Sequence, residues 1–398
     1  MQTHPPSSLL LTPGPVSLPM STKRTMLEDH AFGGRSIVKD IAFARRYLVH
    51  LANAANLGTA IPLPGSGTYA NEAAIQTFVP EGGKLLVHSN GVYGDTLVSI
   101  CRATGTPHSV LRTSPVSPPS AEQFRQALCS DPGITHVMMV HCETSSGLLN
   151  PIDQVGRLCR ELHKVFIVDA VATFGALPLD MRRLAYDVLV LSSNKCLEGP
   201  PGLAWVVANR GVLGACKGNA RSLCLDLWDQ NQHVARTSCF RFTPPTHTVS
   251  AVAQALRAHD GEGGSAARLE RYRRNWRSLV ERMRSFGFRT LLPDTIAAPI
   301  AAVFREPDDP AYDFDAFYLA MLERGLDIYP GPLAVQRTFR IGCIGTVTEH
   351  DMRRAADAVR ETLTALGVRA FGAARARPAP VASIVPNRCL VPSHDRAL

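Results

Sequence analysis

Short apolar runs alternate with helix-period segments through most of this chain, and this alternation constrains the fold more than any other feature. We expect strands at 84–88, 134–141, 165–169 and 187–191. Helical periodicity precedes them at 38–55 and separates them at 94–104 and 153–163. Short β-branched runs bounded by turn residues and separated by helices are typical of βα units. The sequence therefore predicts an α/β fold with a mostly parallel sheet.

The pattern changes after residue 260, where Gly261, Gly263 and Gly264 form a hinge-like break. A long amphipathic helix follows, then shorter strand-like and helical segments at 300–304, 313–324, 326–329, 338–341 and 348–366. We therefore divide the 398 residues into four predicted parts. These are an N-terminal arm (1–20), a large domain (21–260), a small C-terminal α+β domain (261–368) and a disordered tail (369–398).

The charge balance gives no sign of a nucleic-acid partner. The formal net charge is +8, and half of it comes from the tail. The rest of the chain has no basic stripe interleaved with aromatic residues. We expect no nucleic-acid binding.

Cysteine use and hydropathy indicate a compartment. The ten cysteines contain no C-x-x-C pair and no metal-ligand spacing, so we expect reduced thiols, no metal and a cytoplasmic protein. No stretch approaches the length of apolar residues that a membrane span needs. The N-terminus lacks the basic region of a signal peptide. We expect no membrane association.

Lys195 is the first candidate for chemistry. Only six of the 42 basic residues are lysines, and Lys195 follows an apolar strand within Ser-Ser-Asn-Lys-Cys. Ligands of open α/β sheets bind at the carboxyl ends of the strands. A desolvated lysine near other cations can be neutral and nucleophilic. Lys195 is therefore either a Schiff-base lysine or an ordinary loop residue.

Asp169 is the second candidate, because it ends the apolar run 165–169. A buried carboxylate needs a partner. It could cap a helix or a turn. Alternatively, it could keep a heterocyclic nitrogen protonated, as pyridoxal phosphate requires in order to accept electrons.

A Gly-rich turn, Pro-Gly-Ser-Gly-Thr at 64–68, precedes a helix-forming segment. Glycines allow close approach to a phosphate, and a helix N-terminus offers free N–H groups and a positive dipole end. Alone it is equally compatible with a plain helix start. Together with Asp169 and Lys195, however, it provides what a phosphorylated aldehyde cofactor needs: an anion site, an acid partner and an amine.

The motifs around these residues are similar to those of one family. LLLTPGP, PGSGTYANEA, SNGVYGD, VHCETSSGLLNPID, FIVDAVATFG, SSNKCLEGPPG, ACKGNARSLCLDL, RFTPPTHTV, IYPG and FRIGCIG resemble the class V, fold-type I pyridoxal-phosphate aminotransferases, from about residue 9 to 367. The resemblance implies a large domain with a mostly parallel, seven-stranded-type sheet, and pyridoxal 5'-phosphate as cofactor. It also implies a homodimer with the active site at the dimer interface.

The resemblance assigns roles to individual positions. It implies that Lys195 binds the cofactor's aldehyde and shuttles a proton, and that Asp169 faces the pyridine nitrogen. The other implied cofactor-binding residues are Ser66, Gly67 and Thr68 at the phosphate, Tyr93 on the ring, Thr144 near the phenolic oxygen, Asn194, and Thr243 from the neighbouring subunit. The predicted substrate-binding residues are Gly14, Arg35 and Arg340. The resemblance implies that Arg340 grips the substrate's acidic group, whereas Arg35 comes from a segment that departs from the family.

Within the family, the motifs are most similar to members that transfer the amino group of 2-aminoethylphosphonate to pyruvate. One segment departs from those members: DHAFGGRSIVKD replaces a Trp-Asp-rich stretch, which makes Arg35 either a second anion contact or a surface residue. The alternatives are another class V activity with alanine or serine and glyoxylate, a lyase on the same scaffold, or a binding protein that has lost the cofactor.

Overall fold

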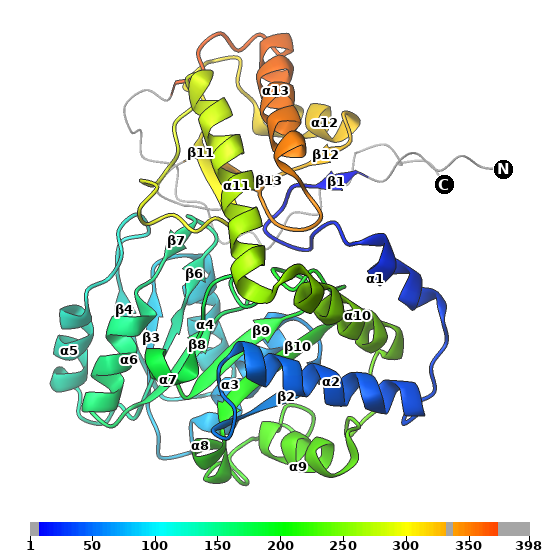
Figure 1. The fold of residues 1–398 in the computed structure, drawn as a ribbon. Coiled ribbons are helices and arrows are strands. Elements are labelled where there is room, and N and C mark those ends of the chain that lie inside the picture. The colour runs from blue at the N-terminus through cyan, green and yellow to red at the C-terminus, as the bar shows by residue number, and fades with distance from the viewer. Residues whose placement is uncertain (1–7, 332–336, 373–398) are drawn as a thin grey trace, which may run out of the picture.

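A seven-stranded sheet forms the centre of the larger part of the protein (Figure 1). The computed structural model describes residues 8–331 and 337–372. The strand order is β2 (Gly58–Pro64), β10 (Leu203–Asn209), β9 (Val188–Ser192), β8 (Val165–Asp169), β5 (His136–Val140), β3 (Leu85–Ser89) and β4 (His108–Arg112). Only the pairings of β10 with β2 and β9 are antiparallel. The expected mostly parallel, seven-stranded sheet is confirmed.

The sheet is buried on both faces, which explains why its strands are continuously apolar. Side chains alternate between two hydrophobic clusters: Val137 and Met139 belong to one, Met138 and Val140 to the other. The first cluster includes residues of α2 (Arg35–Leu51), α5 (Ala121–Ser130), α6 (Ile152–Glu161), α7 (Met181–Leu184), α9 (Leu227–Thr237) and α10 (Thr246–Glu262). The second includes residues of α3 (Gly67–Phe78), α4 (Val92–Ala103) and α8 (Arg210–Gly214).

The smaller part has its own antiparallel sheet and its own core. The sheet order is β11 (Ala301–Arg305), β14 (Thr338–Gly342) and β13 (Tyr329–Pro330). Helices α11 (Gly264–Ser285), α12 (Phe314–Glu323) and α13 (Glu349–Ala365) pack with it around one apolar cluster. In Figure 1, α11 runs from this part to the edge of the large sheet.

The N-terminal segment connects the two parts. Strand β1 (Leu9–Leu10) pairs with β12 (Leu326–Asp327), and Leu11 is buried in the core of the smaller part. The chain then reaches α1 (Met20–Arg24) and a 3-10 turn at Thr25–Leu27. The remaining short strands are β6 (Cys142–Glu143) and β7 (Leu148–Leu149).

Most expected elements lie within a few residues of their predicted bounds. The break predicted at Gly261, Gly263 and Gly264, however, is shorter than expected. Helix α10 continues through Gly261 to Glu262, and only Gly263, with φ of 107°, separates it from α11. Strands β2, β4 and β10 were not predicted. Gly and two Pro residues interrupt the apolar pattern of β2, and β4 is short and only partly buried, whereas β10 is a continuous apolar run that was overlooked. The four-part division of the chain stays a prediction, and the tail beyond residue 372 lies outside the described residues.

In the described part of the chain, no helix is long and apolar enough to cross a membrane. Within the same residues, no cluster of three or more His, Cys, Asp or Glu side chains could hold a metal ion. The nine cysteines described are all free.

Candidate active site

The candidate residues converge at the carboxyl ends of the parallel strands. Asp169 is the last residue of β8, and Lys195 follows the end of β9 by three residues. Strands β8 and β9 are parallel neighbours, so these two ends lie at the same edge of the sheet. This is the edge at which open α/β sheets bind ligands.

Lys195 lies in a short loop closed by two backbone hydrogen bonds. Gly199 N donates to Ser193 O at 2.8 Å, and Glu198 N donates to Lys195 O at 3.0 Å. The Lys195 Nζ donates to the carbonyl of Gly14 at 3.0 Å, and a Cβ on Gly14 would overlap the lysine side chain. Burial, with the nearby charge of Arg340, lowers the pKa of Lys195 to about 8. A lysine with such a pKa is partly unprotonated near neutral pH, as a nucleophile or a base must be.

Asp169 is buried, and protein N–H groups satisfy both of its carboxylate oxygens. Oδ2 accepts from Asn71 Nδ2 at 2.7 Å, and Oδ1 accepts from Val171 N at 2.9 Å. Burial raises the pKa of Asp169, and the two donors and the charge of Lys195 oppose that rise. The sequence analysis missed Asn71. Its signal was its place one helical turn after Gly67 in PGSGTYANEA.

The Gly-rich turn forms the start of α3 beside Asp169. Gly65 has φ of 127°, a conformation that favours glycine. A Cβ on Gly67 would lie 2.5 Å from a methyl group of Val171, so glycine allows α3 to approach the end of β8. Ser66 is the N-cap of α3 without a side-chain capping hydrogen bond, and Ser66 and Thr68 are exposed. The described structure therefore leaves both hydroxyls accessible to an anion.

Arg340, on β14, brings a buried positive charge from the smaller part. Its Nε donates to Pro330 O at 2.9 Å, and its Nη1 donates to Thr144 O at 3.0 Å. Its guanidinium carbon lies 5.7 Å from the centre of the Tyr329 ring. Burial lowers its pKa, although the nearby Tyr93 and Glu143 oppose that shift. No ion pair involves Arg340 within residues 8–331 and 337–372.

Tyr93 and Thr144 both lie near Arg340, and the carboxylate of Glu143 links their segments. Glu143 was not predicted as a site residue. Glu143 is fully buried and accepts from the backbone N–H groups of Tyr93 at 3.1 Å and Gly94 at 3.2 Å, and from the hydroxyl of Ser145. It thus fixes the start of α4, where Tyr93 is 38% exposed. Thr144 holds Arg340 through its carbonyl, and the role predicted for its hydroxyl stays a prediction.

Two predicted residues do not join this group. Arg35 is exposed at the start of α2, and Thr243 is exposed in the loop before α10. No hydrogen bond described in the structure links either of them to Lys195, Asp169 or Arg340. Thr243 was expected to act on the neighbouring subunit, and the single chain does not test that role. Asn194 directly precedes Lys195 and is half-buried.

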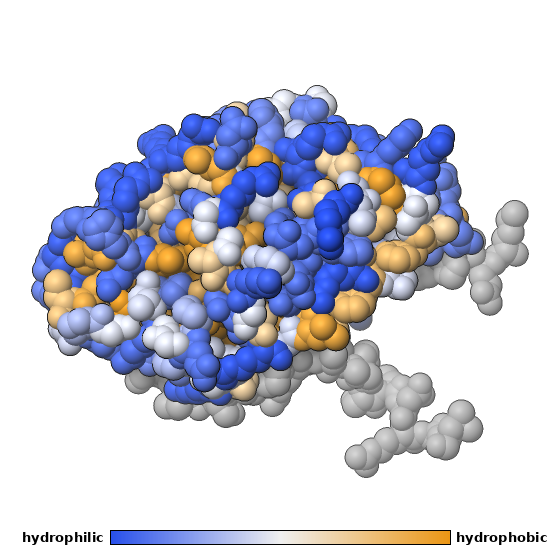
Figure 2. Space-filling model, turned by 90° about the horizontal axis from the view of Figure 1, so that it is seen from below, coloured by the Kyte–Doolittle hydropathy of each residue, from blue (hydrophilic) through white to orange (hydrophobic). Residues whose placement is uncertain are grey.

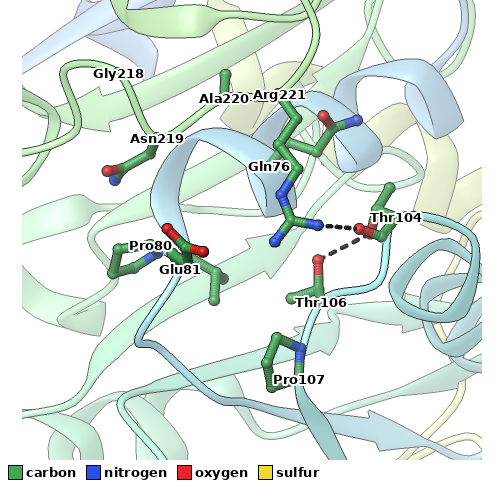
Figure 3. A pocket seen from close by; sticks show the side chains of 11 residues that line it. Gln76, Pro80, Glu81, Thr104, Thr106, Pro107, Gly218, Asn219, Ala220 and Arg221 are labelled. Atoms are coloured by element: carbon green, nitrogen blue, oxygen red, sulfur yellow. Dashed lines mark hydrogen bonds between the residues drawn. The ribbon is translucent and has the colours of Figure 1, made fainter.

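One hollow in the described part of the protein lies away from these residues (Figure 3). A cavity of about 290 Å³ is lined by residues that include Gln76, Glu81, Thr104, Pro107 and Arg221. Pro107 directly precedes β4, so this hollow is at the amino-terminal edge of the sheet, opposite Lys195. Its walls contain none of the candidate residues.

The fold and the site together define a pyridoxal-phosphate-dependent aminotransferase of fold type I. The family model "Aminotransferase class-V" matches residues 29–306, and the chain belongs to that family. Its cofactor is therefore pyridoxal 5'-phosphate.

Two curated relatives are named 2-aminoethylphosphonate–pyruvate transaminase. The one from Pseudomonas putida is 42% identical over 360 residues, which cover 90% of this chain and 98% of the relative. The one from Cupriavidus necator is 42% identical over 368 residues, covering 91% and 96%.

Solved structures agree on the fold. Pyridoxamine-pyruvate aminotransferase from Mesorhizobium loti is similar with a TM-score of 0.84 and 23% identity, over 93% of this chain and 95% of that one. Ureidoglycine-glyoxylate aminotransferase from Bacillus subtilis has a TM-score of 0.83 and 22% identity, over 92% and 96%.

Proposed function

We propose that this aminotransferase transfers the amino group of 2-aminoethylphosphonate to pyruvate, which gives phosphonoacetaldehyde and L-alanine. The names of the relatives from P. putida and C. necator support this donor and acceptor. We further propose that the enzyme works in the cytoplasm, since the nine described cysteines are free.

The observation that carries the proposal is the charge of Arg340. Its two hydrogen-bond acceptors are carbonyl groups, and the nearby carboxylate of Glu143 accepts from Tyr93 N and Gly94 N and forms no described ion pair with it. Burying a cation without an ion-pair partner is costly. A substrate anion would offset that cost. A phosphonate is close to a dianion at neutral pH, and a guanidinium binds such groups with paired donors.

The residues at the sheet edge fit the cofactor. Asn71 Oδ1 is buried without a partner in the described structure, and it adjoins the carboxylate of Asp169. Bound pyridoxal phosphate supplies an electron sink for the carbon that loses a proton. Ser66, Thr68 and the first N–H groups of α3 would hold its phosphate. The negative charge of Asp169 would keep a proton on its ring nitrogen, and the ring of Tyr93 would cover its face.

Lys195 would move the proton of the reaction. Its Nζ is desolvated, with a pKa of about 8, so it can accept a proton from the amine-bearing carbon and return it. The carbonyl of Gly14 orients the Nζ at 3.0 Å. Asn194, next to Lys195, and the hydroxyl of Thr144 would contact the cofactor, while the carbonyl of Thr144 holds Arg340 in place.

We also propose that the enzyme acts as a homodimer. Several large apolar side chains are exposed: Leu27 (84%), Leu223 (68%), Tyr69 (59%), Phe32 (48%) and Phe242 (48%). Figure 2 shows that apolar groups lie between hydrophilic ones on the face drawn there. A second copy would cover such surface. Thr243, next to Phe242, would then reach the partner's cofactor phosphate.

Subunit mixing tests the dimer. Lys195→Ala and Thr243→Ala subunits, each inactive alone, should regain activity when mixed, because one hybrid site has both residues intact. No recovery in a mixture shown to exchange subunits would mean that each site is complete in its own chain.

A donor panel tests the reaction itself. The purified enzyme is incubated with pyruvate and 2-aminoethylphosphonate, and alanine formation is followed. Alanine or serine with glyoxylate forms the comparison. Faster turnover of 2-aminoethylphosphonate supports the proposal, and faster turnover of the glyoxylate pairs would leave the family correct and the substrate wrong.

A further inference from the structure

A buried cluster of charged side chains lies between the Lys195 loop and α11. Its members, named here the Glu198 cluster, are Glu198, Glu262, Arg268, Arg271 and Tyr272. The side chains of Arg268 and Glu198 are only 2% and 5% exposed. Two carboxylates and two guanidinium groups make the cluster formally neutral, which makes its burial tolerable.

The cluster holds the backbone directly after Lys195. Arg268 Nη1 donates to the carbonyl of Cys196 at 2.7 Å, and its Nε donates to Glu262 at 2.6 Å. Arg271 Nη2 donates to Glu198 at 2.8 Å, and Tyr272 OH donates to the same carboxylate oxygen at 2.6 Å. The loop that presents Lys195 is therefore attached to α11.

The same side chains hold the backbone that follows Arg340. Arg271 Nη1 donates to the carbonyl of Gly345 at 2.6 Å, and Gly345 N donates to Tyr272 OH at 3.4 Å. Gly345 lies five residues after Arg340, and a Cβ there would lie 2.9 Å from Val16. The segment is thus enclosed between α11 and the N-terminal arm, so it has little room to shift.

The backbone of Glu198 gives a second, independent observation. Its φ is 54°, in the left-handed region that side chains with a Cβ disfavour. Such a conformation persists when the surroundings hold it in place. Glycine would adopt it without strain, so a glutamate at this position points to a need for its carboxylate.

We propose that the Glu198 cluster is a positioning device that keeps the Lys195 loop and the backbone after Arg340 in a fixed register. It thereby sets the separation between amine and acidic group that a donor must have. The inference rests on the proposed function, in which Lys195 acts at the amine-bearing carbon and Arg340 binds the acidic group. The described hydrogen bonds of the cluster reach the backbone of Cys196 and Gly345 and none of the side chains of Lys195, Asp169 and Arg340.

The test compares two phosphonate donors that differ by one methylene group, 2-aminoethylphosphonate and 3-aminopropylphosphonate, each with pyruvate. Tyr272→Phe removes one oxygen from the cluster, and Glu198→Gln removes its central charge. The matched control is Asp40→Asn, since Asp40 is also buried and accepts from Arg257 at 2.6 Å and Ser250 at 2.8 Å, between α2 and α10. All four holoenzymes are assayed for kcat/KM with both donors, amide hydrogen exchange and Tm.

We expect Tyr272→Phe to reduce the preference between the two donors by about threefold to tenfold, with a larger reduction in Glu198→Gln. Amide exchange should accelerate at 193–199 and at 342–346 together, while Asp40→Asn lowers Tm without changing the preference. If both cluster variants lower Tm but keep the wild-type preference, the cluster is only structural and the proposal is wrong. Should Glu198→Gln not fold, Tyr272→Phe decides alone.

Failure of the proposed function would look different. Wild-type enzyme that uses neither phosphonate donor refutes the donor assignment. The exchange measurement still decides the positioning role in that case, because joint acceleration of the two segments in Tyr272→Phe supports it and unchanged exchange refutes it.

Discussion

The two sides of the candidate site are built in opposite ways. On the side of the large sheet, Asp169 has both carboxylate oxygens satisfied by N–H donors from Asn71 and Val171. On the side of the smaller part, Arg340 is held by two neutral carbonyls and forms no ion pair within the described residues, although the carboxylate of Glu143 is nearby. On the first side, the protein itself satisfies the carboxylate of Asp169. On the second side, the guanidinium of Arg340 needs a bound anion as its partner.

This difference suggests a division of labour. Groups that serve the permanent cofactor are organised by the protein alone, on rigid strand and helix ends. The group that meets a transient substrate keeps an open charge. Removing a residue from the sheet side should therefore affect every substrate, whereas a change at Arg340 should affect anionic substrates selectively.

The largest expected effect is at Lys195. Lys195→Ala should lower kcat by about 10⁴-fold or more with every donor, because the mobile base is lost. Borohydride reduction of the wild-type holoenzyme followed by peptide mapping should label Lys195. Label on Lys217 or Lys84 would refute the assignment of Lys195, and with it the comparison between the two sides of the site.

Asp169→Asn should lower turnover by roughly 10³-fold with all donors, since a neutral amide no longer favours a protonated ring nitrogen. Asp187→Asn is a matched control, because Asp187 also accepts a backbone N–H, from Phe166 at 2.9 Å, and burial raises its pKa too. It precedes β9 at the opposite edge of the sheet. Equal turnover losses in the two variants would mean that the carboxylate of Asp169 is structural.

Arg340→Lys should weaken the handling of the anionic substrate and leave cofactor binding nearly unchanged. The charge stays but the paired geometry is lost, which costs about 1.5–3 kcal/mol, or roughly tenfold to a hundredfold in kcat/KM for the phosphonate. Cofactor affinity, measured by titration of the apoenzyme, should change little.

Arg45→Lys controls for the loss of a guanidinium held by carbonyl groups, because the half-buried Arg45 donates to the carbonyls of Ala60 and Val234. If Arg340→Lys weakens cofactor binding as much as substrate handling, the two sides are not separate.

The same division explains what the sequence could predict. Lys195, Asp169 and the turn at 64–68 have local signals, since each follows from a strand end or a glycine pair a few residues away. Arg340 has no such signal: its acceptors, Thr144 and Pro330, come from distant segments, and only the resemblance to the family selected it. Glu143 and Asn71 were missed because their roles depend on contacts across the fold.

The fold was predictable to a similar extent. Buried parallel strands such as β8 have continuous apolar runs, so their period is visible locally. Strand β2 begins with Gly and ends with Pro, and its seven residues pair antiparallel with residues of β10 that lie 139 to 151 positions later in the chain. Neither its partner nor its direction has a local signal.

The smallest expected effect concerns Asn71, which tests whether the sheet side is as complete as its hydrogen bonds indicate. Asn71→Ala removes one of the two N–H donors to Asp169, while the donation from Val171 N remains. Hydrogen bonds to the charged form stabilise it, so the pKa of Asp169 should rise further above its ordinary value. Asp169 acts as a carboxylate, so activity should then be lost at a higher pH as the pH falls. We expect a loss of about threefold to tenfold in kcat at neutral pH for all donors.

The acidic limb of the pH profile of kcat should move to higher pH. Gln76→Ala on the same helix, where Gln76 donates to Glu72 at 3.1 Å, should leave both unchanged. A loss in Asn71→Ala restricted to the phosphonate donor would show that α3 serves the substrate as well as the cofactor, and the separation of the two sides would then fail.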